Sequence, residues 1–335
     1  MDKREIGSSP VEVEKTPRYR FMITRHAERL PSGELSPEGI EHAKQKGAIV
    51  KGAEVLKAYA SDHASKRAFK TGDLISAESG VKSEASGKQY ATREVPDIQY
   101  DVLKPDLYHI IAGLKLLIEE PTLAEAFSEP ELKKLIDEAV AKDMEKIVSK
   151  KGSDGQLMID MEKLPVDIQM KIAPIRQKYQ KVGFEKCLRD YPEVVYRMAM
   201  GLGHQLTEEF KIAERYSKVR KADRKPAQKD VILNTATHGL FTESLLMKAG
   251  IYVKPDGQEI QDMKVEDFQN KDFGGFVQPG ESIYLDVEDP AKIPEKIPVN
   301  FEGANRPQSG RVFINRKKLG MLNKDYLEWK KSQQG

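Results

Sequence analysis

Two apolar segments, each followed by a helix-forming segment, constrain the fold of this chain most. Residues 19–24 (YRFMIT) predict a short buried strand. Ser36-Pro37-Glu38 then predicts a helix start, because serine caps helices, proline suits the first helical position and an acid suits the first turn. Residues 54–60 (EVLKAYA) predict a second strand, and a second helix is expected through Lys66 to Ile75. The order strand, helix, strand, helix predicts a parallel α/β sheet.

The C-terminal part of the chain continues this alternation. Residues 231–237 (VILNTAT) predict an apolar strand, and the helix that follows is expected to end at Gly250. Apolar residues at 283, 285 and 287 alternate as a half-buried strand requires. A final strand is expected at 311–314, followed by a short terminal helix.

Helix-forming residues dominate the middle of the chain. We interpret residues 106–190 as a helical insertion, and 192–216 as a helix packed on the sheet. The α/β core is then made of residues 18–105 and 191–335, and residues 1–17 are expected to form a loose tail. The basic stretch 218–229 is interpreted as a solvated connection.

Composition and charge exclude several classes of protein. The 335 residues include 55 basic and 53 acidic side chains, a balance that argues against a dedicated nucleic-acid binder. Apolar runs are far shorter than the ~20 residues that span a bilayer, and the charged start is unlike a secretory signal. We therefore expect a cytoplasmic protein without membrane contact. The single cysteine, Cys187, excludes an internal disulfide framework and a cysteine-rich zinc site. We expect no metal site and no cofactor.

Basic and histidine side chains follow three of the expected strands. Arg25, His26 and Arg29 follow the first, Arg67 comes after the second, and His238 follows the third. The carboxyl ends of parallel strands meet at one edge of a sheet, where ligands bind. Guanidinium groups match phosphate oxygens, and their charge keeps a neighbouring imidazole neutral and therefore nucleophilic. This set of residues predicts a phosphate site in which a histidine attacks phosphorus.

In this order, these residues resemble the motifs of the histidine phosphatase superfamily, also called phosphoglycerate mutase-like. Residues 25–29 (RHAER) resemble the R-H-G signature, and residues 35–40 (LSPEGI) resemble the L-T-x-x-G helix that follows it. Residues 61–71 resemble the S-x-x-x-R-A-x-x-T segment, and residues 237–239 (THG) the second-histidine motif. The resemblance covers about residues 20–85 and 192–290.

The resemblance implies a three-layer α/β/α sandwich with a mostly parallel central sheet and a helical insertion that caps the site. It implies that His26 becomes phosphorylated, that Arg25 and Arg67 bind the phosphoryl group, and that His238 stabilises the transition state.

Two positions mix the patterns of two branches of the superfamily. Arg29 matches the longer acid-phosphatase form of the first motif, in which a second arginine also contacts phosphate. Gly239 stands where that branch carries an acid, as in the mutase-like branch, so we include it among the substrate-binding residues.

A leaving alkoxide needs a proton, so a carboxyl group is expected near the nucleophile. In the mutase-like branch this acid follows the third strand, a region that here contains Glu94, Asp97, Asp101 and Asp106. The L-x-E pattern of the family is absent. We favour Asp106 and then Asp101 as the catalytic acid.

The sequence thus predicts a metal-independent phosphomonoester hydrolase that acts on a small phosphorylated substrate through a phosphohistidine. Two alternatives stay open, a phosphoglycerate-type mutase and a non-catalytic member that binds a phosphorylated ligand or protein. Exposed apolar surface on the insertion would favour binding of a partner or a homodimer.

Overall fold

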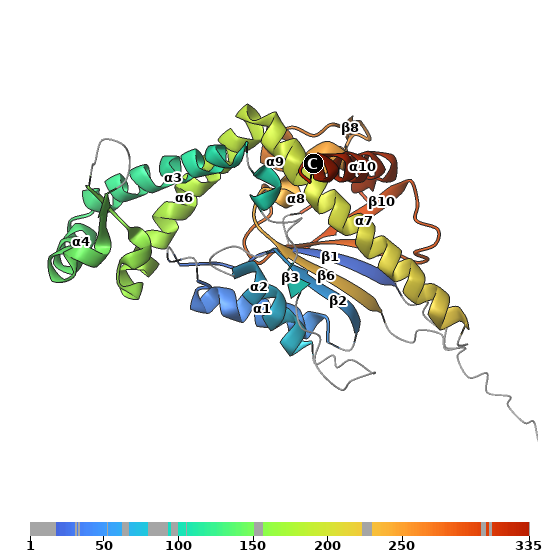
Figure 1. Cartoon of the computed structure of the whole chain (residues 1–335), viewed down its shortest axis with the longest axis horizontal. Helices are drawn as coiled ribbons and strands as arrows, with labels where there is room; N and C mark the ends of the chain where they lie inside the picture. The colour runs from blue at the N-terminus through green and yellow to red at the C-terminus, as the bar shows by residue number, and fades with distance from the viewer. Residues whose placement is uncertain are drawn as a thin grey trace, which may run out of the picture.

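A nine-stranded sheet forms the centre of the molecule in the computed structural model (Figure 1). The structure describes residues 18–30, 32, 34–51, 53–61, 67–79, 93–94, 100–104, 106–150, 157–222, 230–302, 306–307 and 310–334. The strand order is β3-β2-β6-β1-β9-β10-β11-β7-β8. The strands are β1 (Tyr19–Arg25), β2 (Glu54–Ala60), β3 (Arg93–Glu94), β6 (Val231–Thr237), β7 (Gly250–Val253), β8 (Glu259–Gln261), β9 (Ser282–Val287), β10 (Lys296–Phe301) and β11 (Val312–Asn315).

The two halves of this sheet pair differently. β3, β2, β6 and β1 pair in parallel, as the strand–helix alternation predicts. From β1 onward, β9, β10, β11, β7 and β8 pair antiparallel. The α/β architecture is confirmed, but the pairing corrects the expectation of a mostly parallel sheet, because the C-terminal strands return through direct connections rather than helical crossovers. The parallel half is the part that carries the candidate site.

Helices cover both faces of the sheet (Figure 1). Side chains alternate between faces along a strand, so Met22 packs with α1 (Pro37–Ile49) and α2 (Arg67–Glu78). Phe21 points to the other face, where its ring centroid lies 4.5 Å from that of Phe210 on α7 (Pro192–Ala222). That face is also covered by α8 (Phe241–Ala249) and α10 (Arg316–Ser332). The three-layer sandwich is therefore confirmed.

The start of α1 shows why its sequence motif has this form. The Ser36 hydroxyl accepts a hydrogen bond from the Gly39 backbone N–H at 3.1 Å, and Pro37 is the first helical residue. A Cβ atom on Gly39 would lie 2.2 Å from the carbonyl oxygen of Glu28. Glycine is therefore required at this position, because the helix packs directly on the loop that follows β1.

The middle of the chain forms a helical projection with an apolar interior of its own. Its elements are α3 (Tyr108–Ser128), α4 (Pro130–Lys142), α5 (Met144–Ile147), the antiparallel pair β4 (Val148–Lys150) and β5 (Leu157–Ile159), and α6 (Val166–Asp190). α3 and α6 run side by side away from the sheet (Figure 1). Leu123, Ile136, Ile168 and Ile172 lie in a cluster separate from the main core. The β4–β5 hairpin was not expected within this helix-rich stretch.

Several smaller features complete the comparison with the sequence. The connection β7–β8, the short helix α9 (Val265–Gln269), and two 3-10 turns at Tyr100–Leu103 and Met161–Lys163 were not predicted. The terminal helix is longer than expected, since it begins at Arg316. Residues 218–222 of the expected basic loop belong to α7, and residues 1–17 and 223–229 lie outside the described residues.

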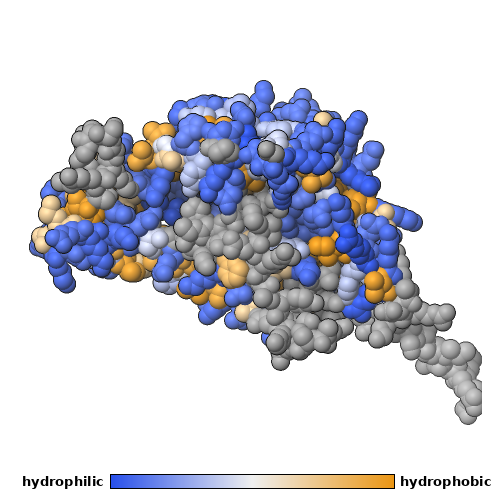
Figure 2. All heavy atoms as spheres, viewed as in Figure 1, coloured by the Kyte–Doolittle hydropathy of each residue, from blue (hydrophilic) through white to orange (hydrophobic). Residues whose placement is uncertain are grey.

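The view in Figure 2 shows a mostly hydrophilic surface with scattered apolar side chains. Among the helices that the structure describes, none combines the length and the apolar composition that crossing a bilayer requires.

Candidate active site

The ends of β1 and β6 bring two histidines together. The strands pair in parallel with Arg25 opposite Thr237, and the His26 backbone N–H donates to the Thr237 carbonyl oxygen at 2.8 Å. The ring centroids of His26 and His238 lie 5.4 Å apart, with an interplanar angle of 65°. Both side chains are buried. Residues more than two hundred positions apart in the sequence thus form one site.

The hydrogen bonding of His26 identifies its tautomer. Nδ1 lies 2.8 Å from the Ala27 carbonyl oxygen. A carbonyl oxygen only accepts, so Nδ1 carries the proton and Nε2 of the neutral ring keeps its lone pair. The pKa of His26 lies well below 6.5 because of burial first, and then because of the nearby charges of Arg67, His238, Arg25 and Arg29. His26 is therefore a neutral imidazole with Nε2 available as a nucleophile at physiological pH.

Arg25 is held from two sides. Its Nη1 donates to the Val277 carbonyl oxygen at 2.5 Å, and its guanidinium carbon lies 5.2 Å from the centroid of the Phe184 ring on α6. A Cβ atom on Gly239 would lie 2.9 Å from Arg25 Nε and 2.8 Å from Phe184 Cε2. Gly239 thus leaves the space that the Arg25 guanidinium occupies.

Arg67 and Arg29 complete the basic surroundings of His26. Arg67 is the first residue of α2 and is buried. After burial, its charge is the strongest cause of the low pKa of His26, and the charge of Arg29 acts in the same direction. The four basic residues expected from the sequence therefore converge on one imidazole.

Glu243 is a site-supporting residue that the sequence reasoning missed. Its buried carboxylate accepts hydrogen bonds from the backbone N–H groups of Leu240 at 3.1 Å and Val277 at 2.9 Å. Leu240 has a φ of 81°, a left-handed conformation that is rare for leucine and places its N–H toward Glu243. Burial raises the pKa of Glu243, and the charge of Arg25 opposes this. An acid in the first turn of the helix that follows His238 was the available signal.

Asp106 and Asp101, the expected catalytic acids, do not line the cavity beside His26. Asp106 is 54% exposed and accepts two hydrogen bonds of 3.0 Å from Arg197 on α7. Its hydrogen bond with Arg197 lowers its pKa, which disfavours the protonated form that a proton donor needs. Asp101 is exposed and pairs with Lys104 at 2.7 Å. Asp97 and the side chain of Glu94 lie outside the described residues.

A cavity of about 370 Å³ opens beside His26. The sheet side of the cavity is formed by Arg25, His26, Glu28 and Arg29. α6 forms another part of the wall, with Met170, Ala173, Pro174, Arg176, Gln177 and Gln180. A second cavity of about 450 Å³ continues past Arg25 toward Lys178 and Lys181. The helical projection therefore contributes directly to the space in which a substrate would lie.

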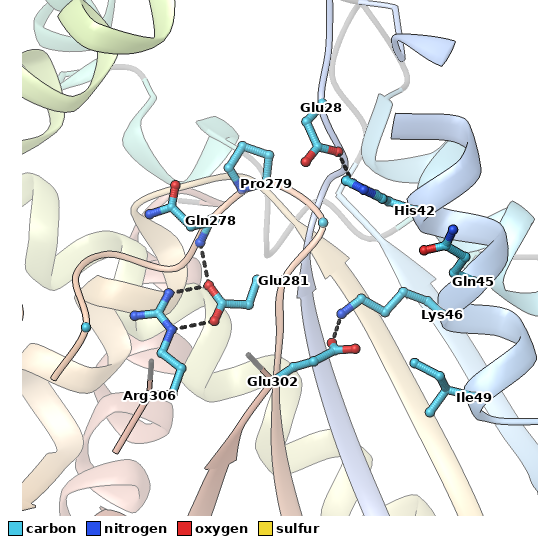
Figure 3. A pocket seen from close by; sticks show the side chains of 12 residues that line it. Glu28, His42, Gln45, Lys46, Ile49, Gln278, Pro279, Glu281, Glu302 and Arg306 are labelled. Carbon is cyan, nitrogen blue, oxygen red and sulfur yellow. Dashed lines mark hydrogen bonds and ion pairs between the residues drawn. The ribbon is translucent and has the colours of Figure 1, made fainter. Parts of the chain in front are cut away.

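A third cavity, of about 540 Å³, is lined in part by the loop that contains Gly280 (Figure 3). Its charged residues are paired: Glu28 Oε2 with His42 Nδ1 at 2.8 Å, Lys46 with Glu302, and Arg306 with Glu281. Burial lowers the pKa of Lys46 to about 8. The Gly280 backbone N–H donates to the carbonyl oxygens of Arg25 at 3.2 Å and His26 at 3.1 Å, so this loop supports the end of β1. Glu28 and Pro279 line both this cavity and the one beside His26.

Comparison with known proteins places these observations in context. No protein-family model and no curated protein sequence matches the chain. Among solved structures, the chain is similar to a phytase from Hafnia alvei (TM-score 0.44, 10% identity, covering 92% of this chain and 96% of the phytase). It is also similar to a phosphoglycerate mutase from Bacillus anthracis (TM-score 0.32, 10% identity, 87% and 94% covered). A third is a multiple inositol polyphosphate phosphatase from Bifidobacterium longum (TM-score 0.32, 12% identity, 88% of each chain).

The residue roles proposed below rest on the geometry of this chain's own site and not on these likenesses.

Proposed function

We propose that this protein is a phosphomonoester hydrolase that works through a phosphohistidine on His26. One observation carries the proposal: a buried imidazole whose Nδ1 proton is held by the Ala27 carbonyl oxygen, leaving Nε2 as the nucleophile. The convergence of Arg25, Arg67 and His238 on this ring supports a phosphate ligand, because cations and hydrogen-bond donors stabilise phosphoryl oxygens.

The reaction proceeds in two displacements. His26 Nε2 attacks phosphorus, the N–P bond forms and the bond to the ester oxygen breaks, so that the alcohol leaves with a proton from an acid. Water then attacks the phosphohistidine and releases orthophosphate and free His26. Arg25 and Arg67 offset charge on the phosphoryl oxygens, and His238 contacts one of them. No step requires a metal ion.

We propose Glu94 as the proton donor in place of Asp106 and Asp101. β3 pairs with β2 so that Glu94 stands level with Ala60, the residue before Ser61, at the carboxyl edge of the parallel half. Glu94→Gln should lower kcat/KM for an alkyl phosphate by ~100-fold or more and should affect an aryl phosphate much less, because a phenolate leaves without protonation. Equal losses on both substrates would exclude this role.

We also propose that residues 106–190 act as a cap that sets substrate choice, with residues 18–105 and 191–335 as the catalytic core. The wall that α6 contributes to the cavity beside His26 supports this division. A volume of about 370 Å³ lies at the low end of ligand pockets, ~300–1,000 Å³. It favours a small phosphorylated molecule over a phosphoprotein.

Hydrolysis of p-nitrophenyl phosphate with chelator present tests the proposed function. Wild type should be active and His26→Ala inactive, while His109→Ala, at an exposed position on α3, should retain activity. Denatured, quenched wild type should carry acid-labile phosphate on His26.

Three other results would count against hydrolysis as the function. Chelator-sensitive activity, or activity that persists in His26→Ala, would contradict the mechanism. Transfer of the phosphoryl group from the enzyme to a second alcohol in preference to water would indicate a mutase. Phosphate binding without any phosphoenzyme would indicate a non-catalytic protein.

A further inference from the structure

Arg176 is the most unusual charged side chain of the cavity beside His26. It lies on α6, is 8% exposed, and lines this cavity. Within the residues that the structure describes, its guanidinium makes no hydrogen bond. Buried polar groups are nearly always hydrogen-bonded, and a buried cation is costly unless it is paired. Among the described residues this cation therefore has no hydrogen-bond partner, and its nitrogen atoms are not among the fully enclosed ones, so they can be reached from the cavity.

The carboxylates nearest to Arg176 are engaged by another cation. Glu119 and Glu162 are close enough for their charges to act on Arg176. Both pair with Lys115, whose Nζ lies 3.4 Å from Glu119 Oε1 and 3.2 Å from Glu162 Oε1. These acids make the burial of Arg176 tolerable without taking up its five N–H donors.

The acids on the cavity wall are also engaged. Glu28 pairs with His42 at 2.8 Å. Glu38 lies in the first turn of α1, where hydrogen bonds from its own backbone N–H and from Ser36 lower its pKa and hold its charge. Among the described residues that line the cavity, neither acid is therefore paired with Arg176.

The anion that Arg176 binds is distinct from the phosphoryl group that His26 attacks. In the proposed reaction the phosphoryl group lies against His26, Arg25 and Arg67, on the sheet side of the cavity. Arg176 lies on α6, eight residues before Phe184, whose ring packs on the Arg25 guanidinium, so that it stands ~12 Å along the helix from that contact. An anion that pairs with Arg176 is therefore a second group of the same substrate.

We infer that the substrate is a phosphomonoester that carries a second anionic group, a carboxylate or another phosphate, and that Arg176 binds this group. The inference rests on the proposed function and names the substrate class of that site. The planar guanidinium suits either anion, because both accept two parallel N–H bonds.

Two matched substrate pairs test the inference on the full chain. O-phosphoserine differs from O-phosphoethanolamine by a carboxylate, and propane-1,3-diyl bisphosphate differs from propyl phosphate by a second phosphate. For wild type, we expect kcat/KM to be about 10- to 100-fold higher for the doubly anionic member of at least one pair, the size of a charge-assisted hydrogen bond. The pair that shows the preference identifies the chemistry of the second group. Equal values in both pairs would overturn the inference without any variant.

Substitution of Arg176 shows whether this residue causes the preference. Arg176→Gln should lower kcat/KM for the preferred substrate about 10- to 100-fold, through KM, with a much smaller change for its singly anionic partner. Arg176→Lys should restore part of the preference because it keeps the charge. Arg189→Gln removes a guanidinium from the same helix at an exposed position, 3.4 Å from Glu266, and should not change the preference.

The possible failures can be told apart. If Arg176→Gln lowers both members of a pair equally, or neither, Arg176 has a structural role only and the inference is wrong. If Arg176→Gln does not fold, the wild-type preference and Arg176→Lys decide. If wild type hydrolyses p-nitrophenyl phosphate through His26 but shows no preference, only the inference fails. If no phosphate ester is hydrolysed and no phosphoenzyme forms, the proposed function fails first.

Discussion

A buried carboxyl group on α7, which is hydrogen-bonded to strand β6, gives the sharpest quantitative prediction. Glu209 on α7 is fully buried, and its Oε1 accepts hydrogen bonds from the Thr235 hydroxyl of β6 and from Gln205 Nε2. Oε2 has no hydrogen-bond partner among the described residues. Burial raises the pKa of Glu209 from 4.5 to about 7, against the opposing effect of these two hydrogen bonds.

The raised pKa means that the folded protein binds this proton more tightly than the unfolded chain does. The stabilisation by the proton is complete below the unfolded pKa of 4.5 and is lost as the pH rises through about 7. At ~1.36 kcal/mol per pH unit, the free energy of unfolding falls by roughly 3 kcal/mol across this range. Glu209→Gln removes the titration and keeps the shape of the side chain.

Urea unfolding followed by circular dichroism, from pH 4.5 to 8.5, measures the effect. The difference in unfolding free energy between Glu209→Gln and wild type should shift in favour of the variant by about 3 kcal/mol as the pH rises. Glu208→Gln is the matched control, because the Glu208 side chain is 41% exposed on the same helix and pairs with Lys211 at 2.6 Å. A difference between Glu209→Gln and wild type that stays constant with pH would refute the reasoning.

Three further predictions concern the site. Because the pKa of His26 lies well below 6.5, kcat/KM for p-nitrophenyl phosphate should stay high as the pH falls through 6.5 and decline only at lower pH; a decline centred at 6.5 in the pH–rate profile would contradict this. Gly239→Ala should displace Arg25 and lower kcat/KM ~10- to 100-fold, whereas Gly113→Ala, where an added Cβ meets no atom within 4 Å, should leave steady-state kinetics unchanged. Glu243→Gln should lower the melting temperature and weaken the binding of inorganic phosphate, measured by calorimetry. The reason is that one of the N–H groups of Leu240 and Val277 loses its carboxylate acceptor. An unchanged affinity would exclude a link between Glu243 and Arg25.

The basic and histidine residues of the site could be predicted from the sequence because each directly follows an apolar strand or begins the next helix. Strand ends are encoded locally, by an apolar run and the residues that stop it. The parallel pairing of β1 with β6 then brings His26 and His238 together. Local sequence patterns were sufficient here because the pairing of the two strands brings their ends together.

The pairing of Asp106, the acid favoured from the sequence, could not be predicted in the same way. The turn that holds Asp106 packs against α7, where Arg197 binds both carboxylate oxygens. This contact joins residues ninety-one positions apart, and no local pattern announces it. The roles of Glu243 and Arg176 depend equally on partners that are remote in sequence. Burial and pairing, the properties that give these groups their chemistry, exist only in the folded chain.

The helical projection has an interior separate from that of the sheet. Its apolar cluster around Leu123, Ile136 and Ile172 shares no member with the core around β1 and β6. Residues such as Gln177 and Gln180 on the cavity wall can therefore be exchanged while the strands that hold His26 and His238 keep their packing. If the proposed function holds, the reaction depends on one hydrophobic core and the choice of substrate on another, so substitutions on the cavity wall can change the substrate while the strands beside the histidines keep their packing.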